Sequence, residues 1–209
     1  MKKINVDLSA TSLTVLASPP EPRMTPADRE RIRAAILEQF SLMVPPHFRG
    51  LVDAFGDEVL ARKLVGGNLF IHGAPGSGKT VLGLMALRLM ALRRGTGMVR
   101  FLSCPDFIFG LQGDYEAANY EVREVMRFPG WLMLDDFGAE KLTDFTRQTY
   151  YLIINHREQW DLPTIITSNL NLNEVDAWID RRLSSRIAGM CGKDRIIERA
   201  GDRRLAGKK

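Results

Sequence analysis

Cysteine and histidine are scarce in this sequence, and it contains no long apolar run. The 209 residues include only two cysteines, Cys104 and Cys191, and three histidines. They do not have the spacing of a metal site, so we expect reduced thiols and packed or solvated imidazoles in a cytoplasmic protein. The longest strongly apolar run, residues 81–87, is far too short to cross a bilayer. Asp7 and several hydroxyl residues interrupt the N-terminal segment, which argues against a signal peptide.

The remaining composition is that of an ordinary globular protein, with 45% hydrophobic and 26% charged residues. This is enough apolar material for one sizeable core. The net charge of +4 is unevenly distributed. Residues 181–209 contain ten Lys or Arg and three acidic residues, a net charge of +7, whereas the rest of the chain carries −3. The basic end indicates either a polyanionic partner, such as nucleic acid or nucleotide phosphates, or a solvated tail.

Segments of strand and helix length alternate along most of the chain. Strands are predicted at residues 69–71, 99–102, 131–134, 164–167 and 195–198. Helices are predicted at residues 81–94, 144–159 and 174–188, and residues 105–128 are expected to be mostly helical with a break near 110–114. This alternation predicts an α/β fold with a parallel sheet and helices on both faces.

A separate helix is predicted ahead of this alternating region. Thr25 is a suitable N-cap and Pro26 a suitable first helical residue, and apolar residues then recur at helical spacing as far as Met43. The apolar stripe is either part of the core or a surface for docking a partner. We therefore divide the chain into a short N-terminal extension, residues 1–44, and a main domain, residues 45–209.

The strongest motif is a glycine-rich loop between a predicted strand and a predicted helix. It matches the phosphate-binding pattern G-x-x-x-x-G-K-[ST] at every fixed position. Backbone N–H groups of such a loop, together with the N-terminus of the following helix, bind phosphates. We expect Lys79 to neutralise the β- and γ-phosphates of ATP and the Thr80 hydroxyl to bind Mg²⁺. The residues of the loop are Gly73, Ala74, Pro75, Gly76, Ser77, Gly78, Lys79 and Thr80.

Polar residues follow two other predicted strands. Asp135 and Asp136 come directly after residues 131–134, and Asn169 closely follows residues 164–167. We expect Asp135 to hold Mg²⁺ through water and Asp136 to orient and deprotonate the attacking water. Asn169 is expected in the crevice at the carboxyl ends of the strands, where it can touch the γ-phosphate and the water. The strand before Asp135 is not the next one along the chain after the phosphate loop, so a further strand fits between the two in the sheet.

In this order and spacing, the motifs resemble those of the AAA+ ATPases, and more narrowly the DnaC/IstB-type group. That group contains bacterial and phage replicative helicase loaders and the ATPase subunit of certain transposition systems. The resemblance covers roughly residues 45–209, and it implies the three-layer αβα sandwich of a P-loop NTPase. Only 40 residues follow Asn169, so we expect no full C-terminal lid domain. The resemblance rests on the phosphate loop, Leu134-Asp135-Asp136-Phe137-Gly138, Thr167-Ser168-Asn169, Arg182-Leu183-Ser184-Ser185-Arg186-Ile187 and Pro45-Pro46-His47-Phe48-Arg49.

The resemblance also implies roles for single residues. Asn169 would be sensor 1, and Arg186 would be an arginine finger that reaches the ATP of a neighbouring subunit in a ring or spiral oligomer. Arg182 is the alternative finger, and an ordinary surface arginine is the alternative reading of Arg186. Arg203, or alternatively Arg204, would contact the nucleotide as a residue resembling sensor 2. Asp136 departs from the family, which usually has Glu there, and the shorter side chain moves the base by about 1 Å, which is expected to slow hydrolysis.

The function implied by the resemblance is an ATP-dependent loader that binds a DnaB-type replicative helicase and single-stranded DNA. ATP binding and hydrolysis would switch its release. In such loaders, helices before the Asp135 strand face the DNA, and here Arg123 and Arg127 would be the phosphate contacts. Two alternatives remain open: an IstB-like transposition regulator that acts on duplex DNA, and a nucleotide-gated adaptor with little hydrolysis.

Overall fold

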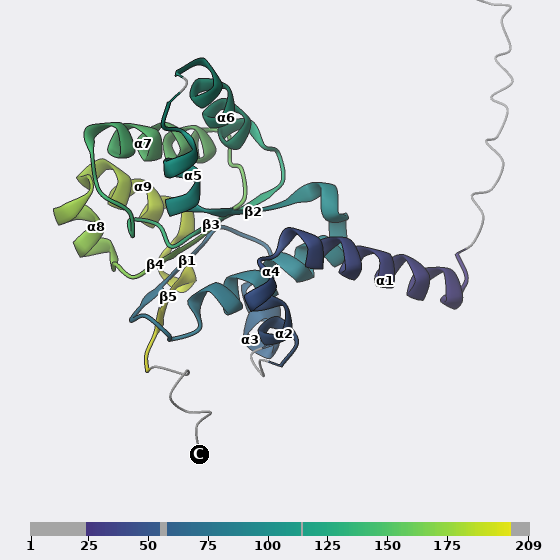
Figure 1. The fold of residues 1–209 in the computed structure, drawn as a ribbon. Helices are drawn as coiled ribbons and strands as arrows, with labels where there is room; N and C mark the ends of the chain where they lie inside the picture. Colours follow the sequence, from purple (N-terminus) through teal and green to yellow (C-terminus); the bar gives the residue numbers. More distant parts are fainter. Residues whose placement is uncertain (1–23, 55–57, 114, 202–209) are drawn as a thin grey trace, which may run out of the picture.

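The computed structural model describes residues 24–54, 58–113 and 115–201, and its centre is a five-stranded sheet between two layers of helices (Figure 1). The strand order is β2-β3-β4-β1-β5, and all neighbouring strands are parallel. This confirms the predicted α/β sandwich, and β4 indeed lies between β1 and β3. The strands are β1 (Leu69–Gly73), β2 (Val99–Ser103), β3 (Trp131–Asp135), β4 (Thr164–Ser168) and β5 (Ile196–Arg199).

Both faces of the sheet are buried, because successive side chains of a strand point to opposite faces. Leu132 and Leu134 of β3 pack in one core, and Met133 between them packs in the other. In β1, Phe70 belongs to the first core and Ile71 to the second. This double burial explains why the strands read as nearly continuous apolar runs.

The helices form two layers, one on each face of the sheet (Figure 1). The layer that contains α4 also contains the N-terminal helices, and the other layer contains α5 to α9. None of the helices in the described part of the chain is long and apolar enough to span a membrane. The first layer consists of α1 (Pro26–Met43), α2 (Pro46–Ala54), α3 (Glu58–Leu64) and α4 (Lys79–Arg94); the second consists of α5 (Cys104–Gly110), α6 (Tyr115–Arg127), α7 (Asp144–Gln159), α8 (Leu172–Trp178) and α9 (Arg181–Cys191).

Helix α4 lies unusually close to the sheet at Gly83. A Cβ atom at this position would be 2.6 Å from Cε of Met133 and 3.3 Å from Cγ2 of Thr167. The absence of a side chain at Gly83 therefore lets α4 pack directly on β3 and β4. Since α4 begins at the phosphate loop, this contact fixes the loop relative to the ends of both strands.

Two helical regions differ from the sequence prediction. Residues 46–54 and 58–64, to which no element was assigned, form α2 and α3. The predicted helix at residues 174–188 is two helices, α8 and α9. The break arises at Asp180, whose carboxylate accepts a hydrogen bond from the backbone N–H of Arg182 at 2.7 Å and so caps the start of a second helix.

Helix α1 has the predicted bounds, and Thr25 and Asp28 form a capping box at its start. Its apolar stripe packs only near the C-terminal end. Phe40 is buried against the layer of α4, whereas Ile32, two turns earlier, keeps 48% of its surface exposed. The stripe therefore belongs to the core at one end and is open to solvent at the other.

Candidate functional site

The glycine-rich loop joins β1 to α4 and has the backbone geometry of a tight curl. Gly73, Gly76 and Gly78 all have positive φ angles, of 143°, 80° and 86°. Gly78 is the N-cap of α4 in the left-handed region, which other residues rarely adopt. At Gly73, a Cβ atom would be 2.1 Å from the carbonyl oxygen of Arg199 on β5. The loop consequently requires glycine at positions 73 and 78. It also places the N-terminus of α4 at the edge of the pocket described below.

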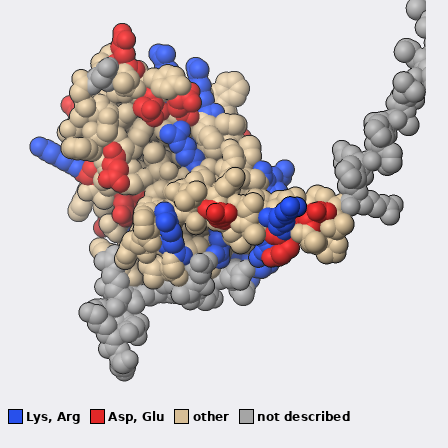
Figure 2. All heavy atoms as spheres, turned by 45° about the vertical axis from the view of Figure 1, so that its right-hand side comes forward, with Lys and Arg blue, Asp and Glu red and all other residues tan. Residues whose placement is uncertain are grey.

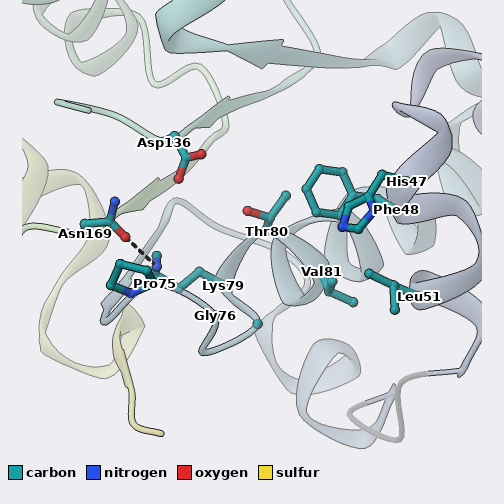
Figure 3. Close-up of a pocket in the computed structure, with 11 residues that line it drawn as sticks. His47, Phe48, Leu51, Pro75, Gly76, Lys79, Thr80, Val81, Asp136 and Asn169 are labelled. Atoms are coloured by element: carbon teal, nitrogen blue, oxygen red, sulfur yellow. Dashed lines mark hydrogen bonds between the residues drawn. The ribbon is translucent and has the colours of Figure 1, made fainter. Parts of the chain in front are cut away.

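The Lys79 side chain runs back across the loop. Its Nζ donates hydrogen bonds to the backbone oxygen of Ala74 at 3.0 Å and to Oδ1 of Asn169 at 2.8 Å (Figure 3). Only 5% of Lys79 is exposed. The ammonium group therefore links the phosphate loop to the end of β4.

Asp135 ends β3 and is buried, with 4% of its surface exposed. Burial is the main reason that its pKa rises to about 6, and the nearby charge of Asp136 raises it further. This rise is partly offset by hydrogen bonds from the hydroxyls of Thr167 and Thr80 and by the charge of Lys79, which all lower the pKa of Asp135. A buried carboxylate beside a hydroxyl is a donor set that suits Mg²⁺, because a divalent cation offsets the cost of burying the charge.

Asp136 has a φ angle of 54°, one of two positive φ values among the described residues other than glycine. In a continuing strand, its side chain would point to the face opposite that of Asp135. With its left-handed backbone, the Asp136 side chain instead lies at the carboxyl end of β3, where it lines the pocket with Lys79 and Thr80 (Figure 3). Both acidic residues are therefore close to the phosphate loop.

A pocket of about 360 Å³ lies over the loop, a volume typical of small-molecule sites. One side is polar, with Lys79, Asp136 and Asn169, and the other is largely apolar, with side chains from α2 (Figure 3). A nucleotide has the same division, between its charged phosphates and its planar base. The lining residues are His47, Phe48, Leu51, Pro75, Gly76, Gly78, Lys79, Thr80, Val81, Asp136 and Asn169.

The α2 side of the pocket was missed as a site in the sequence. His47 and Phe48 lie edge to face with ring centroids 5.1 Å apart, and Leu51 lies one turn further along α2. The available signal was the run from Pro45 to Arg49, which was used for the family resemblance but was not linked to a ligand. The apolar side of the pocket depends on α2 folding over the loop, and a local pattern does not reveal this contact.

Arg186 is not brought into the pocket. Its guanidinium forms an ion pair with Glu158 and donates to Oη of Tyr151 at 3.4 Å, both on α7. Arg182 stacks on the same Tyr151 ring, 4.5 Å from its centroid, and pairs with Asp180. The structure thus gathers Lys79, Thr80, Asp135, Asp136 and Asn169 at one place and leaves both arginines on the α7–α9 surface. Arg203 lies outside the described residues.

Comparison with known proteins gives one family match. The family described as IstB-like ATP binding protein matches residues 63–200, which include the loop, β3, β4 and α9. The match begins in α3, so it does not include the α2 side of the pocket.

Three of the similar proteins are named as the helicase loaders DnaI and DnaC. The replicative helicase loader DnaI of Bacillus subtilis (strain 168) is 28% identical over 112 residues, which make up 53% of this chain and 35% of that protein. A solved structure of the DnaC helicase loader is 27% identical with a TM-score of 0.54, covering 74% of this chain and 86% of the other. A solved structure of DnaI is 25% identical with a TM-score of 0.52, covering 87% and 88%. The chain spans about a third of the length of its curated relative.

Proposed function

Since the chain belongs to the family of IstB-like ATP-binding proteins, we propose that its pocket binds Mg-ATP and that it loads a replicative helicase onto DNA. One observation carries the choice of a loader. The likeness to the DnaC and DnaI structures reaches 27% and 25% identity over at least 74% of each chain. Because it covers 74% and 87% of this chain, it supports more than a shared phosphate loop.

In this proposal, the two sides of the pocket bind the two ends of ATP. The triphosphate lies along the loop, where backbone N–H groups and the N-terminus of α4 bind its oxygens. The Lys79 ammonium gives up one of its two hydrogen bonds, to Ala74 or Asn169, and donates to a phosphate oxygen instead. The adenine covers Phe48 and Leu51. Phe48 is half-buried and Leu51 is 36% exposed, so both have apolar surface for a base to cover.

The chemistry of hydrolysis is assigned to the ends of β3 and β4. Thr80 and Asp135 would hold Mg²⁺, which supplies positive charge to the β- and γ-phosphates. Asp136 accepts a proton from the attacking water and Asn169 holds that water and the γ-phosphate in line. The hydrogen bond between Asn169 and Lys79 supports this role, since it places the amide beside the loop.

Arg186 is assigned to the pocket of a neighbouring subunit. Within one subunit its guanidinium is held on α7, away from Lys79, while 27% of its side chain remains exposed. It therefore has to act in trans if it acts on ATP at all. We expect a ring or spiral oligomer in which assembly supplies the finger and stimulates hydrolysis.

Single-stranded DNA is assigned to the surface of α5 and α6. Three aromatic side chains are exposed there, Phe109 at 74%, Tyr115 at 78% and Tyr120 at 63%. Exposed rings are stacking platforms for unpaired bases. Figure 2 shows acidic and basic side chains mixed at this upper end of the molecule, so attraction of phosphates by Arg123 and Arg127 is partly cancelled by neighbouring acids. Stacking would supply most of the binding.

The helicase is assigned to the N-terminal extension, residues 1–44. The solvent-exposed part of α1 includes Ile32 and Leu42, which is 72% exposed, and both are available to a partner helix or groove. Phe40 anchors α1 to the layer of α4. Binding at α1 is therefore connected to the helix that begins at the phosphate loop.

A pull-down with a hexameric DnaB-type helicase in ATP, in ADP and without nucleotide tests the proposal. We expect binding in at least one nucleotide state and release in another. Tyr115→Ala and Tyr120→Ala should weaken binding of single-stranded DNA, while Trp160→Ala, which removes an exposed aromatic residue just after the end of α7, should not. Absence of helicase binding in every nucleotide state would contradict the loader assignment.

The second candidate is a transposition regulator, which the IstB-like family match favours over 138 consecutive residues, 63–200. It predicts a preference for duplex DNA and long ATP-dependent oligomers in place of helicase binding. A nucleotide-gated adaptor would be indicated if Asp136→Ala left turnover unchanged. These outcomes are separated by measuring DNA preference, oligomer length and turnover on the same protein.

A further inference from the structure

Thr167 lies near the carboxyl end of β4 and is completely buried. Its side chain faces the end of β3 on one side and Gly83 of α4 on the other. It touches the pocket only through other residues, because it is not among the side chains that line it.

The Thr167 hydroxyl joins the two acidic residues at the end of β3. Its Oγ1 accepts a hydrogen bond from the backbone N–H of Asp136 at 3.1 Å and donates to Oδ1 of Asp135 at 2.5 Å. A hydroxyl has one hydrogen to donate. Since the backbone N–H can only donate, the hydroxyl hydrogen is directed to the Asp135 carboxylate, and this orients one of its oxygens.

The backbone of Thr167 also holds Phe137, the residue after Asp136. Its carbonyl oxygen accepts a hydrogen bond from the N–H of Phe137 at 2.8 Å. Asp136, between the two anchored positions, has the positive φ angle that brings its side chain into the pocket. A left-handed residue other than glycine persists where its surroundings determine it. Thr167 supplies hydrogen bonds on both sides of this strained residue.

From this geometry we infer that Thr167 is a positioning residue, whose hydroxyl sets Asp135 toward the metal and Asp136 toward the attacking water. The inference rests on the proposed Mg-ATP site. It assigns to Thr167 a part in metal-dependent nucleotide binding as well as in hydrolysis. Threonine suits the position better than serine in one respect, because Cγ2 next to Gly83 limits rotation of the hydroxyl.

Two substitutions separate the hydroxyl from the shape of the side chain. Thr167→Val keeps the volume and removes the hydroxyl, and Thr167→Ser keeps the hydroxyl and removes the methyl. ATP affinity is measured in Mg²⁺ and in EDTA, and turnover is measured separately as kcat and KM. For Thr167→Val we expect the Mg²⁺-dependent gain in affinity to fall about fivefold and kcat to fall about tenfold, with KM changed less than about threefold. Thr167→Ser should recover most of both.

Thr164→Val is the matched control in the same strand. Thr164 is also buried, but its Oγ1 accepts a hydrogen bond from Nε of Arg157 at 2.8 Å, at the opposite end of β4. We expect this variant to lose stability while its Mg²⁺-dependent affinity and kcat stay close to those of the unmodified protein. Thermal denaturation of all variants reports whether they are folded.

Each outcome decides the inference. Thr167→Val with unchanged metal dependence and kcat would overturn it, as would Thr167→Ser with losses as large as those of Thr167→Val. The serine variant keeps the test valid if the valine variant does not fold. Failure of the unmodified protein to bind ATP would instead contradict the proposed function, so the two failures are distinguishable.

Discussion

Lys79 and Asn169 are joined by a hydrogen bond of 2.8 Å, from Nζ of the first to Oδ1 of the second. They are 90 residues apart in the chain and lie at the start of α4 and just after β4. The contact is possible because β1 and β4 are adjacent and parallel, so their carboxyl ends meet at one edge of the sheet. It brings the residue expected to bind phosphate together with the residue expected to sense it.

Replacing Asn169 should therefore affect turnover more than binding. Asn169→Ala removes one acceptor from Lys79 but leaves the loop and the Ala74 contact in place. We expect ATP affinity to change less than about threefold and kcat to fall about 10- to 100-fold, as for loss of one polar group that acts on the transition state. A nucleotide titration measures the affinity and steady-state hydrolysis measures kcat; Asn173→Ala, at an exposed position of α8, is the control. Equal losses of kcat in the two variants would contradict the assignment.

Asp135 is expected to lower the stability of the nucleotide-free protein. Its pKa in the fold is about 6, above the ordinary 3.8, mainly because of burial, with Asp136 raising it and Thr167, Thr80 and Lys79 lowering it. A carboxyl group with a raised pKa favours folding while it is protonated. That contribution is complete below about pH 4 and is lost as the pH rises through about 6.

The measurement is urea unfolding of the unmodified protein and of Asp135→Asn at several pH values. At pH 8 the variant should be more stable by about 1–3 kcal/mol, and the difference should shrink towards zero near pH 4. The same substitution should reduce Mg²⁺-dependent ATP binding. An asparagine variant that is less stable than the unmodified protein at pH 8 would contradict this reading of the buried carboxylate.

Arg186→Ala should keep ATP binding and lose the hydrolysis that depends on assembly. The loss is expected to be about 100-fold or more, since a finger supplied in trans stabilises charge on the transferring phosphoryl group. Arg182→Ala, which contacts the same Tyr151 ring, tests the alternative finger, and we expect it to keep the hydrolysis that depends on assembly. Mixing Arg186→Ala with a Lys79→Ala subunit should restore part of the activity. Isolated monomers that hydrolyse ATP as fast as assemblies do would exclude the finger.

Phe48→Ala tests the apolar side of the pocket. Loss of one aromatic contact with a base is expected to weaken ATP binding about 5- to 10-fold. Binding of inorganic tripolyphosphate, which has no base, should be unchanged. Phe145→Ala, at a position that is 43% exposed on α7, is the control. Equal weakening of both ligands by Phe48→Ala would place the base elsewhere.

The sequence predicted well where structure follows local pattern. The five strands were found because burial on both faces produces apolar runs, and the phosphate loop was found because glycines are required at fixed positions. The break between α8 and α9 was missed, although Asp180 is a recognisable cap, because the apolar spacing continues on both sides of it. Asn171 and Glu174 likewise marked an earlier start for α8.

Contacts between distant segments could not be predicted in this way. The apolar side of the pocket depends on α2 lying over the loop. Arg157 reads as a surface residue of α7, yet it is fully buried and donates five hydrogen bonds to backbone oxygens and to Thr164. Burial lowers its pKa to about 10. A charge becomes acceptable in such a place only when the fold supplies acceptors, and no local pattern shows this.

The most direct test of the central claim is a calorimetric titration of ATP and Mg²⁺ into the unmodified protein and into Lys79→Ala, with Lys63→Ala, an exposed lysine of α3, as the control. We expect one ATP per chain for the unmodified protein and for the control, and an affinity at least about 100-fold weaker for Lys79→Ala. Equal binding by Lys79→Ala, or no binding by the unmodified protein at millimolar ATP, would contradict it.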